Sequence, residues 1–135
     1  MKTLISTLFL GGALIFNSYS QTTEKTKDVF KQYNEKGQLI REVYGNLLIG
    51  RAFKDFKYDE KGNKIEENYK EDNNGDGKFE YQVISKYDEN GNKIGMISKY
   101  DSDLDGKFDH LVREKYDENG NLIERIPKRG KIKDD

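Results

Sequence analysis

Two acidic segments carry the residues with the clearest chemistry. Residues 101–109 read Asp-Ser-Asp-Leu-Asp-Gly-Lys-Phe-Asp, and residues 72–80 read Asp-Asn-Asn-Gly-Asp-Gly-Lys-Phe-Glu. Each places oxygen-bearing side chains at its first, third, fifth and ninth positions, with a Gly at the sixth that permits a sharp turn. A loop of this kind turns alternate side chains inward, and carboxylate oxygens are the hard ligands that Ca²⁺ prefers.

Each segment therefore predicts a calcium site. The seventh residue can add its backbone carbonyl to the side-chain ligands. The predicted ligands of the second segment are Asp101, Asp103, Asp105, Asp109 and the Lys107 carbonyl. Those of the first segment are Asp72, Asn74, Asp76, Glu80 and the Lys78 carbonyl. The alternative is a solvated hairpin tip, in which Asp and Gly serve only to form the turn.

The two segments are not expected to bind equally. The 101–109 segment has a fourth carboxylate where the 72–80 segment has the neutral Asn74. Because carboxylate charge raises affinity for a hard divalent ion, we expect 101–109 to bind more tightly, with both sites in the weak range of about 10⁻⁴ to 10⁻³ M. Leu104 argues against this ranking, because the 72–80 segment has the more flexible Gly75 at the equivalent position.

A second phrase alternates with the acidic segments and reveals a repeat. Tyr-Asp-Glu-Lys/Asn-Gly begins at residues 58, 87 and 116, and the acidic segments begin at 72 and 101, so both recur every 29 residues. Tyr33-Asn-Glu-Lys-Gly37 is an earlier copy, which lies 25 residues before Tyr58 and lacks an acidic segment. A shared period indicates a repeat architecture. Because residues 44–50 suffice to connect strands in the short repeat, the acidic segments are not needed for the turn alone.

The elements that position these segments are predicted to be β-strands. Asp or Asn followed by Gly is typical of hairpin turns, and the flanks alternate polar and apolar residues with a period of two. Phe79, Tyr81 and Val83 would share one face, as Phe108 and His110 would one repeat later. The fold class is therefore all-β, an antiparallel up-and-down meander of about eight strands built from repeated hairpins, with curling or closure expected to cover its apolar face. The predicted strands are 28–33, 38–44, 48–58, 63–70, 78–87, 92–100, 107–116 and 121–127.

The acidic segments resemble two known classes of calcium loop. They match EF-hand loops over six positions but have Val83 and Val112 where an EF-hand places its bidentate Glu. They are more similar to the D-x-[DN]-x-D-G-x-x-[DE] loops in the β-hairpins of integrin-type propellers, a resemblance that implies a site completed by Glu80 and Asp109. The Tyr-Asp-x-x-Gly phrase resembles the YD repeats of secreted Rhs-type and teneurin-type proteins, although the period here is longer.

The N-terminal segment predicts export. Lys2 precedes an apolar run, and Ser18-Tyr-Ser20 supplies the small residues that a signal peptidase reads, so residues 1–20 are predicted to be a signal peptide cleaved before Gln21. The run is shorter than a membrane span requires. The rest of the chain, 21–135, would form one β-hairpin repeat domain with polar tails near 21–27 and 128–135, and the protein would be secreted or periplasmic.

Composition narrows the function further. The chain has 24 basic and 25 acidic residues, which leaves no basic excess for nucleic acid, and it has no Cys. An exported domain of this size without disulfides needs another source of stability, and bound metal is one. His110 is the single His, and no Ser–His pair can be recognised. We therefore expect a non-catalytic calcium-binding module that binds an extracellular protein or glycan; the alternatives are a metal-free structural repeat and a small carbohydrate-active enzyme.

Overall fold

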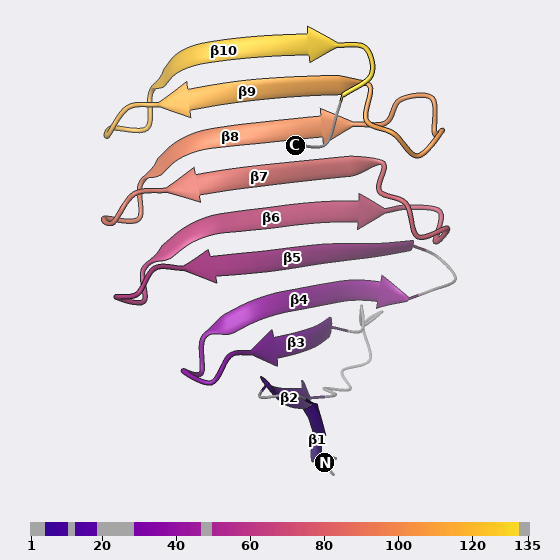
Figure 1. The fold of residues 1–135 in the computed structure, drawn as a ribbon, viewed down its shortest axis with the longest axis vertical. Helices are drawn as coiled ribbons and strands as arrows, with labels where there is room; N and C mark the ends of the chain where they lie inside the picture. The colour runs from indigo at the N-terminus through magenta and orange to yellow at the C-terminus, as the bar shows by residue number, and fades with distance from the viewer. Residues whose placement is uncertain (1–4, 11–12, 19–28, 47–49, 133–135) are drawn as a thin grey trace, which may run out of the picture.

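The chain folds as one open antiparallel sheet whose strand order follows the sequence (Figure 1). The computed structural model describes residues 5–10, 13–18, 29–46 and 50–132. The repeat region forms eight strands: β3 (Val29–Tyr33), β4 (Leu39–Asn46), β5 (Gly50–Tyr58), β6 (Lys64–Asp72), β7 (Tyr81–Tyr87), β8 (Lys93–Tyr100), β9 (His110–Tyr116) and β10 (Leu122–Arg129). The predicted all-β meander is confirmed.

Two further strands precede the repeat region. They are β1 (Ile5–Leu10) and β2 (Ala13–Ser18), which form a hairpin within the predicted signal peptide. The β2 strand pairs with the edge of β3 through Ile15 opposite Gln32 and Phe16 opposite Lys31. Cleavage before Gln21 remains a prediction, and the predicted tail 21–27 lies outside the described residues.

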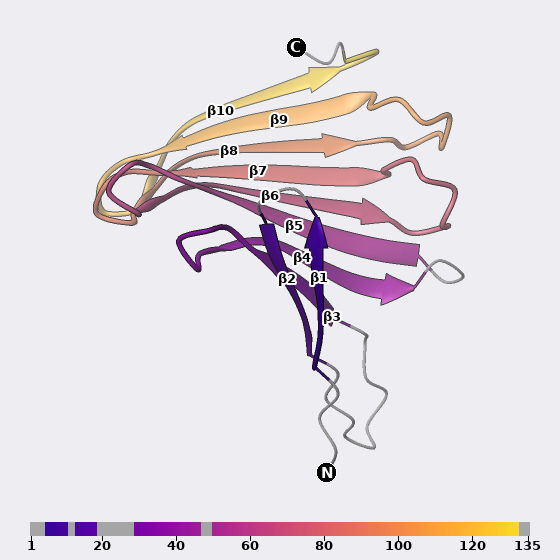
Figure 2. The ribbon, with the colours of Figure 1, turned by 60° about the horizontal axis from the view of Figure 1, so that its bottom comes forward.

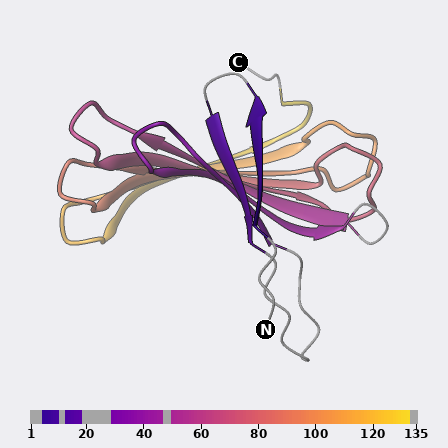
Figure 3. The same cartoon turned by 90° about the horizontal axis from the view of Figure 1, so that it is seen from below.

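The sheet does not close. Within the described residues every strand pairs only with its neighbours in sequence, so β1 and β10 remain at opposite edges of a ten-stranded sheet. For the described part of the chain, Figures 2 and 3 show a twisted sheet with no second layer packed on either face of the repeat strands. Closure into a barrel, one of the expected ways to cover the apolar face, is therefore wrong.

Short turns fix the register at one end of the hairpins. In the third copy the Gly91 N–H donates to the Asp88 carbonyl (3.1 Å), while the Asp88 carboxylate accepts the N–H groups of Asn90 (2.9 Å) and Asn92 (2.8 Å). Hydrogen bonds from Asn92 lower the pKa of Asp88. Gly91 has a φ of 83°, the left-handed conformation that the turn phrase predicts.

One face of the sheet, here called the tyrosine face, carries a series of Tyr side chains from neighbouring strands. The Tyr81 and Tyr100 ring centroids are 4.8 Å apart, and those of Tyr69 and Tyr81 are 6.3 Å apart. The Tyr44 and Tyr69 hydroxyls donate to Glu42 and Glu71 on their own strands. Tyr44, Tyr69 and Tyr81 are half-buried among side chains of this face rather than under a second layer, whereas Tyr100 is exposed.

The opposite face, here called the Phe53 face, departs from the predicted alternation. The Phe79 ring lies 5.6 Å from the Phe53 ring, with Lys70 Nζ 5.1 Å from its centroid, and Phe108 lies under Lys99 in the same way. The assignment of Phe79 to the face of Tyr81, and of Phe108 to that of His110, is therefore wrong. Both Phe residues precede the start of β7 or β9, so strand alternation does not apply to them.

The core is small for a chain of 135 residues. Among residues whose burial is described, Leu111 is the only buried hydrophobic residue, whereas six polar or charged residues are buried. Backbone ladders and cross-strand pairs must therefore supply much of the stability. Examples are the ion pairs of Lys31 with Glu42 (3.0 Å) and of Lys57 with Glu66 (2.8 Å).

Candidate metal centre

The two acidic segments form neighbouring loops at the same end of the strands. The 72–80 loop connects β6 to β7, and the 101–109 loop connects β8 to β9 (Figure 1). Lys78 extends from the first loop to the second, where its Nζ lies 3.3 Å from the Asp105 carbonyl. Its aliphatic chain occupies the space beside Gly106, where an added Cβ would lie 2.3 Å from Lys78 Cδ.

The 101–109 loop brings three of its predicted ligands together. Asp101, Asp103 and Asp105 each place a carboxylate oxygen within 4.8 Å of the others. Asp101 is only 5% exposed; its Oδ2 accepts the Gly106 N–H (2.7 Å), and its Oδ1 is buried without a hydrogen-bond partner. A buried carboxylate oxygen without a partner lowers the stability of the folded state, so a hydrogen-bond donor or a cation at this oxygen would stabilise the loop.

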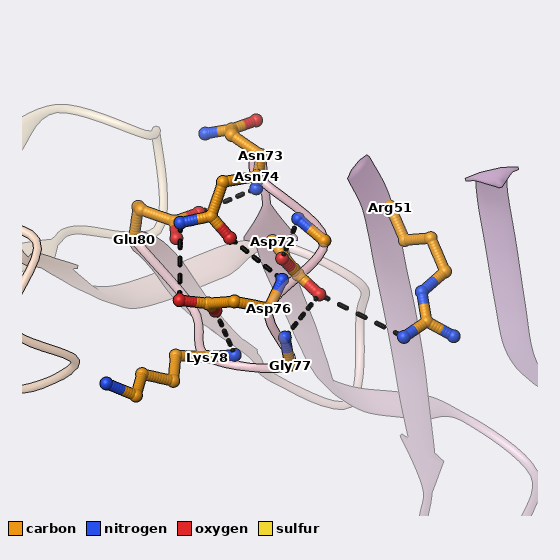
Figure 4. A network of polar contacts seen from close by, with 9 residues as sticks. Arg51, Asp72, Asn73, Asn74, Asp76, Gly77, Lys78 and Glu80 are labelled. Carbon is orange, nitrogen blue, oxygen red and sulfur yellow. Dashed lines mark hydrogen bonds and ion pairs between the residues drawn. The ribbon is translucent and has the colours of Figure 1, made fainter. Parts of the chain in front are cut away.

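The 72–80 loop gathers Asp72, Asp76 and Glu80, again within 4.8 Å (Figure 4). Asp72 is 1% exposed, but both of its oxygens have partners. Its Oδ1 accepts the Gly75 N–H (2.7 Å), and its Oδ2 accepts the Gly77 N–H (3.2 Å) and lies 3.9 Å from Arg51 Nη2.

The third and seventh positions contribute mainly to the loop itself. Asn74 Oδ1 accepts the Asp76 N–H (2.9 Å), and its side-chain amide donates to Asp76 Oδ2 (3.3 Å). The Lys78 and Lys107 N–H groups donate to Asp76 and Asp105, each at 2.8 Å. Ligation by their carbonyl oxygens remains a prediction.

The ninth positions of the loops differ. Glu80 belongs to its acidic cluster and accepts the Asn73 N–H (2.6 Å). Asp109 is outside the cluster of its loop: it accepts hydrogen bonds from the backbone and side chain of Ser102 and lies 2.7 Å from His110 Nδ1. The Ser102 hydroxyl, and next His110, lower the pKa of Asp109 to about 2. An ion in this loop would gain Asp109 only if the side chain left these partners.

Ser102, His110 and Asp109 form a cluster that the sequence did not reveal. Ser102 Oγ lies 3.4 Å from His110 Nδ1, and Asp109 Oδ1 lies 2.7 Å from that same nitrogen. In a nucleophile–base–acid triad the Ser and the carboxylate contact different ring nitrogens. Here both contact Nδ1, so the His cannot relay a proton from Ser102 toward Asp109. The cluster fixes the end of the loop instead.

Two other features were missed or only partly anticipated. Arg51 lies on β5, outside both motifs. It occupies the position equivalent to Glu80 one repeat of 29 residues earlier, so aligning the repeats would have pointed to it. Leu104 has a φ of 60°, close to the 77° of Gly75. Leu104 thus adopts the left-handed conformation without being Gly, which is a local strain in the 101–109 loop.

Comparisons with protein-family models, with curated proteins and with solved structures found no match to this chain. In the part of the chain that the structure describes, there is no helix of the length and apolar character that crossing a membrane would require.

Proposed function

We propose that this protein is an exported, non-catalytic β-repeat module that binds Ca²⁺ at its acidic hairpin loops. The observation that carries the proposal is Asp101, a buried carboxylate with one oxygen left without a partner beside the carboxylates of Asp103 and Asp105. A hard divalent cation satisfies such an oxygen and removes the repulsion among the three acids.

The fold gives the ion a physical role. A single-layer sheet with little buried apolar surface gains less from the hydrophobic effect than a two-layer domain of similar length. An ion held by the β8–β9 loop would join residues 101–105 to the end of β8 and rigidify that side of the sheet. Binding to the folded state alone raises the free energy of unfolding according to the ratio of free ion to Kd.

The module would present its tyrosine face to a partner. Half-exposed aromatic rings beside carboxylates and Lys side chains suit an extracellular protein or a glycan. The resemblance of the turn phrase to secreted YD repeats and the signal-like residues 1–20 support a secreted or periplasmic location. Few repeats are present, so a shell like those of large YD-repeat proteins is not proposed.

A metal-free structural repeat is the second candidate. It is favoured by the internal hydrogen bonds of the acidic loops, since Asp72, Asp76, Asp103 and Asp105 all accept backbone N–H groups as ordinary turn-forming residues do.

Thermal unfolding separates the two candidates. The melting temperature should rise by several degrees in 10 mM CaCl₂ relative to excess chelator, because a site with a Kd of about 10⁻⁴ to 10⁻³ M would be filled and would add about 1.4 to 2.7 kcal/mol. Equal ionic strength in NaCl is the control for screening of the surface charges. A melting temperature that depends on ionic strength but not on calcium would favour the metal-free repeat.

A further inference from the structure

The two acidic loops differ in the residue that neighbours their buried aspartate from the preceding segment of the chain. On β5, Arg51 is the register partner of Asp72, and its guanidinium points toward that carboxylate (Figure 4). One period of 29 residues later, Asp101 takes the place of Asp72 and Glu80 that of Arg51. The Asp101 N–H donates to the Glu80 carbonyl (3.0 Å), so the two residues are indeed neighbours. The Glu80 carboxylate, however, belongs to the 72–80 loop, so the guanidinium beside Asp72 has no cationic counterpart at the equivalent position beside Asp101.

The buried carboxylates reflect this difference. Asp72 has two backbone N–H donors and the guanidinium, whose Nη2 lies 3.9 Å from Oδ2. Among the described residues, Asp101 has a single hydrogen-bond donor, the Gly106 N–H, and its Oδ1 has none. Two Lys side chains reach the 101–109 loop: Lys78 Nζ contacts the Asp105 backbone carbonyl, and Lys99 Nζ lies over the Phe108 ring.

Arg51 is held in place by its surroundings. The guanidinium carbon lies 5.4 Å from the centroid of the Phe53 ring, which in turn packs edge-on against Phe79. Gly50 lets β5 approach the loop closely, because a Cβ there would lie 2.6 Å from the carbonyl oxygens of Asp72 and Asn73. A guanidinium remains charged at every pH at which the protein is folded. The positive charge beside Asp72 is therefore a built-in part of the fold.

We propose that Arg51 serves as the internal counter-cation of the 72–80 loop and that the divalent ion is therefore bound preferentially by the 101–109 loop, at Asp101, Asp103 and Asp105. The first calcium ion would then fill the 101–109 loop, and the 72–80 loop would fill only at higher calcium. The inference rests on the proposed function, since it assigns the first calcium ion to one of two loops with nearly the same motif.

The charge of Arg51 is large enough to separate the loops. Charges of +1 and +2 about 6 Å apart repel each other by an energy equivalent to about ten-fold in affinity, even with the dielectric constant of water. Removing the Arg51 charge should strengthen calcium binding by the 72–80 loop by about that factor and leave the 101–109 loop unchanged. Arg51→Gln tests this, and Arg51→Lys, which keeps the charge, is its matched control.

A calcium titration followed by NMR can read the loops separately, because Gly77 and Gly106 each donate to the buried Asp of their own loop. In the wild-type chain the Gly106 amide should shift and saturate at lower calcium than the Gly77 amide. In Arg51→Gln the Gly77 response should move to about ten-fold lower calcium. Arg41→Gln, which removes an Arg paired with Asp55 at 2.5 Å elsewhere on β4, should leave both responses as in the wild type.

The outcomes distinguish failure of the inference from failure of the proposed function. Saturation of both loops at the same calcium in the wild type, or an unchanged Gly77 response in Arg51→Gln, would overturn the role of Arg51 while calcium binding stood. The same conclusion follows if Asp72→Asn, and not Asp101→Asn, removes the tighter response. If no amide responds to calcium in any variant, the proposed function fails and the inference with it.

Discussion

Left-handed backbone positions divide the loop residues into those that are strained and those that are not. The turn glycines Gly37, Gly62, Gly91 and Gly120 have φ values of 75°, 94°, 83° and 81°, which cost Gly little. Leu104, at 60°, adopts a similar conformation at a cost of about 1 to 2 kcal/mol. The 101–109 loop thus combines the larger number of carboxylates with a strained backbone position. The 72–80 loop has fewer carboxylates and no such strain, because Gly75 takes the equivalent position.

Gly91→Ala should destabilise the protein by about 1 kcal/mol, because the cost of a left-handed Ala is not offset by contacts. An added Cβ at Gly91 meets no atom within 4 Å, so the cost is conformational. Gly95→Ala is a suitable control: Gly95 lies in β8 without a positive φ, and its Cβ would make an ordinary contact of 3.6 Å with the Glu114 carbonyl. Chemical denaturation should show a loss for Gly91→Ala and none for Gly95→Ala; equal effects would mean that the turn geometry is not the cause.

At the scale of the strands, the alternation of side chains predicted the meander and most of its boundaries, but not where the loops end. The predicted strands at 78–87 and 107–116 begin at Tyr81 and His110, three residues later than expected. The polar–apolar alternation continues through Lys78, Phe79 and Glu80, yet Glu80 turns back to the Asn73 N–H and Phe79 crosses to the Phe53 face. A polar–apolar period of two residues cannot distinguish a strand from a loop in which each side chain makes its own separate contacts.

The C-terminal strand extends beyond its predicted end for a related reason. β10 runs to Arg129, and the Gly130 N–H donates to the Asp109 carbonyl (2.8 Å) just as Asp101 does to Glu80 one period earlier. The Ile132 N–H donates to the Phe108 carbonyl (2.9 Å). The predicted frayed tail therefore begins too early at 128, because the polar composition of the segment conceals backbone pairing set by the repeat.

The loop sites were more predictable in identity than in arrangement. The spacing placed Asp101, Asp103 and Asp105 in one cluster, as expected for inward-facing alternate residues. It could not place Asp109, whose carboxylate is held by Ser102 and His110, because those contacts depend on where β9 begins. Arg51 was beyond a motif-based prediction because it comes from a different hairpin.

The tyrosine face predicts how the sheet responds to alkali. Burial, followed by hydrogen bonding to Glu71, raises the pKa of Tyr69 to about 12, and Tyr44 and Tyr81 are also raised to about 12, mainly by burial. A folded pKa above the unfolded value of 10 favours the protonated, folded form, so this stability is complete below pH 10 and is lost as the pH rises toward 12.

Unfolding should therefore accompany ionisation of these Tyr residues between pH 10 and 12, measured as tyrosinate absorbance and circular dichroism in one titration. Tyr69→Phe removes one ionisable hydroxyl and should make the alkaline loss of stability less steep. Ionisation of all Tyr near pH 10 with the sheet intact would contradict the burial of this face.

At the scale of the whole molecule, an open single-layer sheet makes local loop energetics matter for global stability. Because few apolar side chains are buried, the unsatisfied Asp101 carboxylate is a significant cost in the metal-free state. The same carboxylate becomes stabilising once a cation binds it. One side chain therefore has opposite effects on the free energy of unfolding in chelator and in calcium.

The effect of Asp101→Asn on the melting temperature should change sign between chelator and calcium. In chelator the variant should melt at or above the wild-type temperature, since the neutral amide keeps an acceptor for the Gly106 N–H and removes a buried charge that has no partner. In 10 mM CaCl₂ it should melt below the wild type, by the binding energy of about 1.4 to 2.7 kcal/mol that it forfeits. Asp88→Asn, a turn aspartate outside both acidic clusters, should shift the melting temperature equally in both conditions. If Asp101→Asn lowers the melting temperature equally with calcium and with chelator, Asp101 acts only as a turn former, and the loops of this sheet are structural rather than metal-binding.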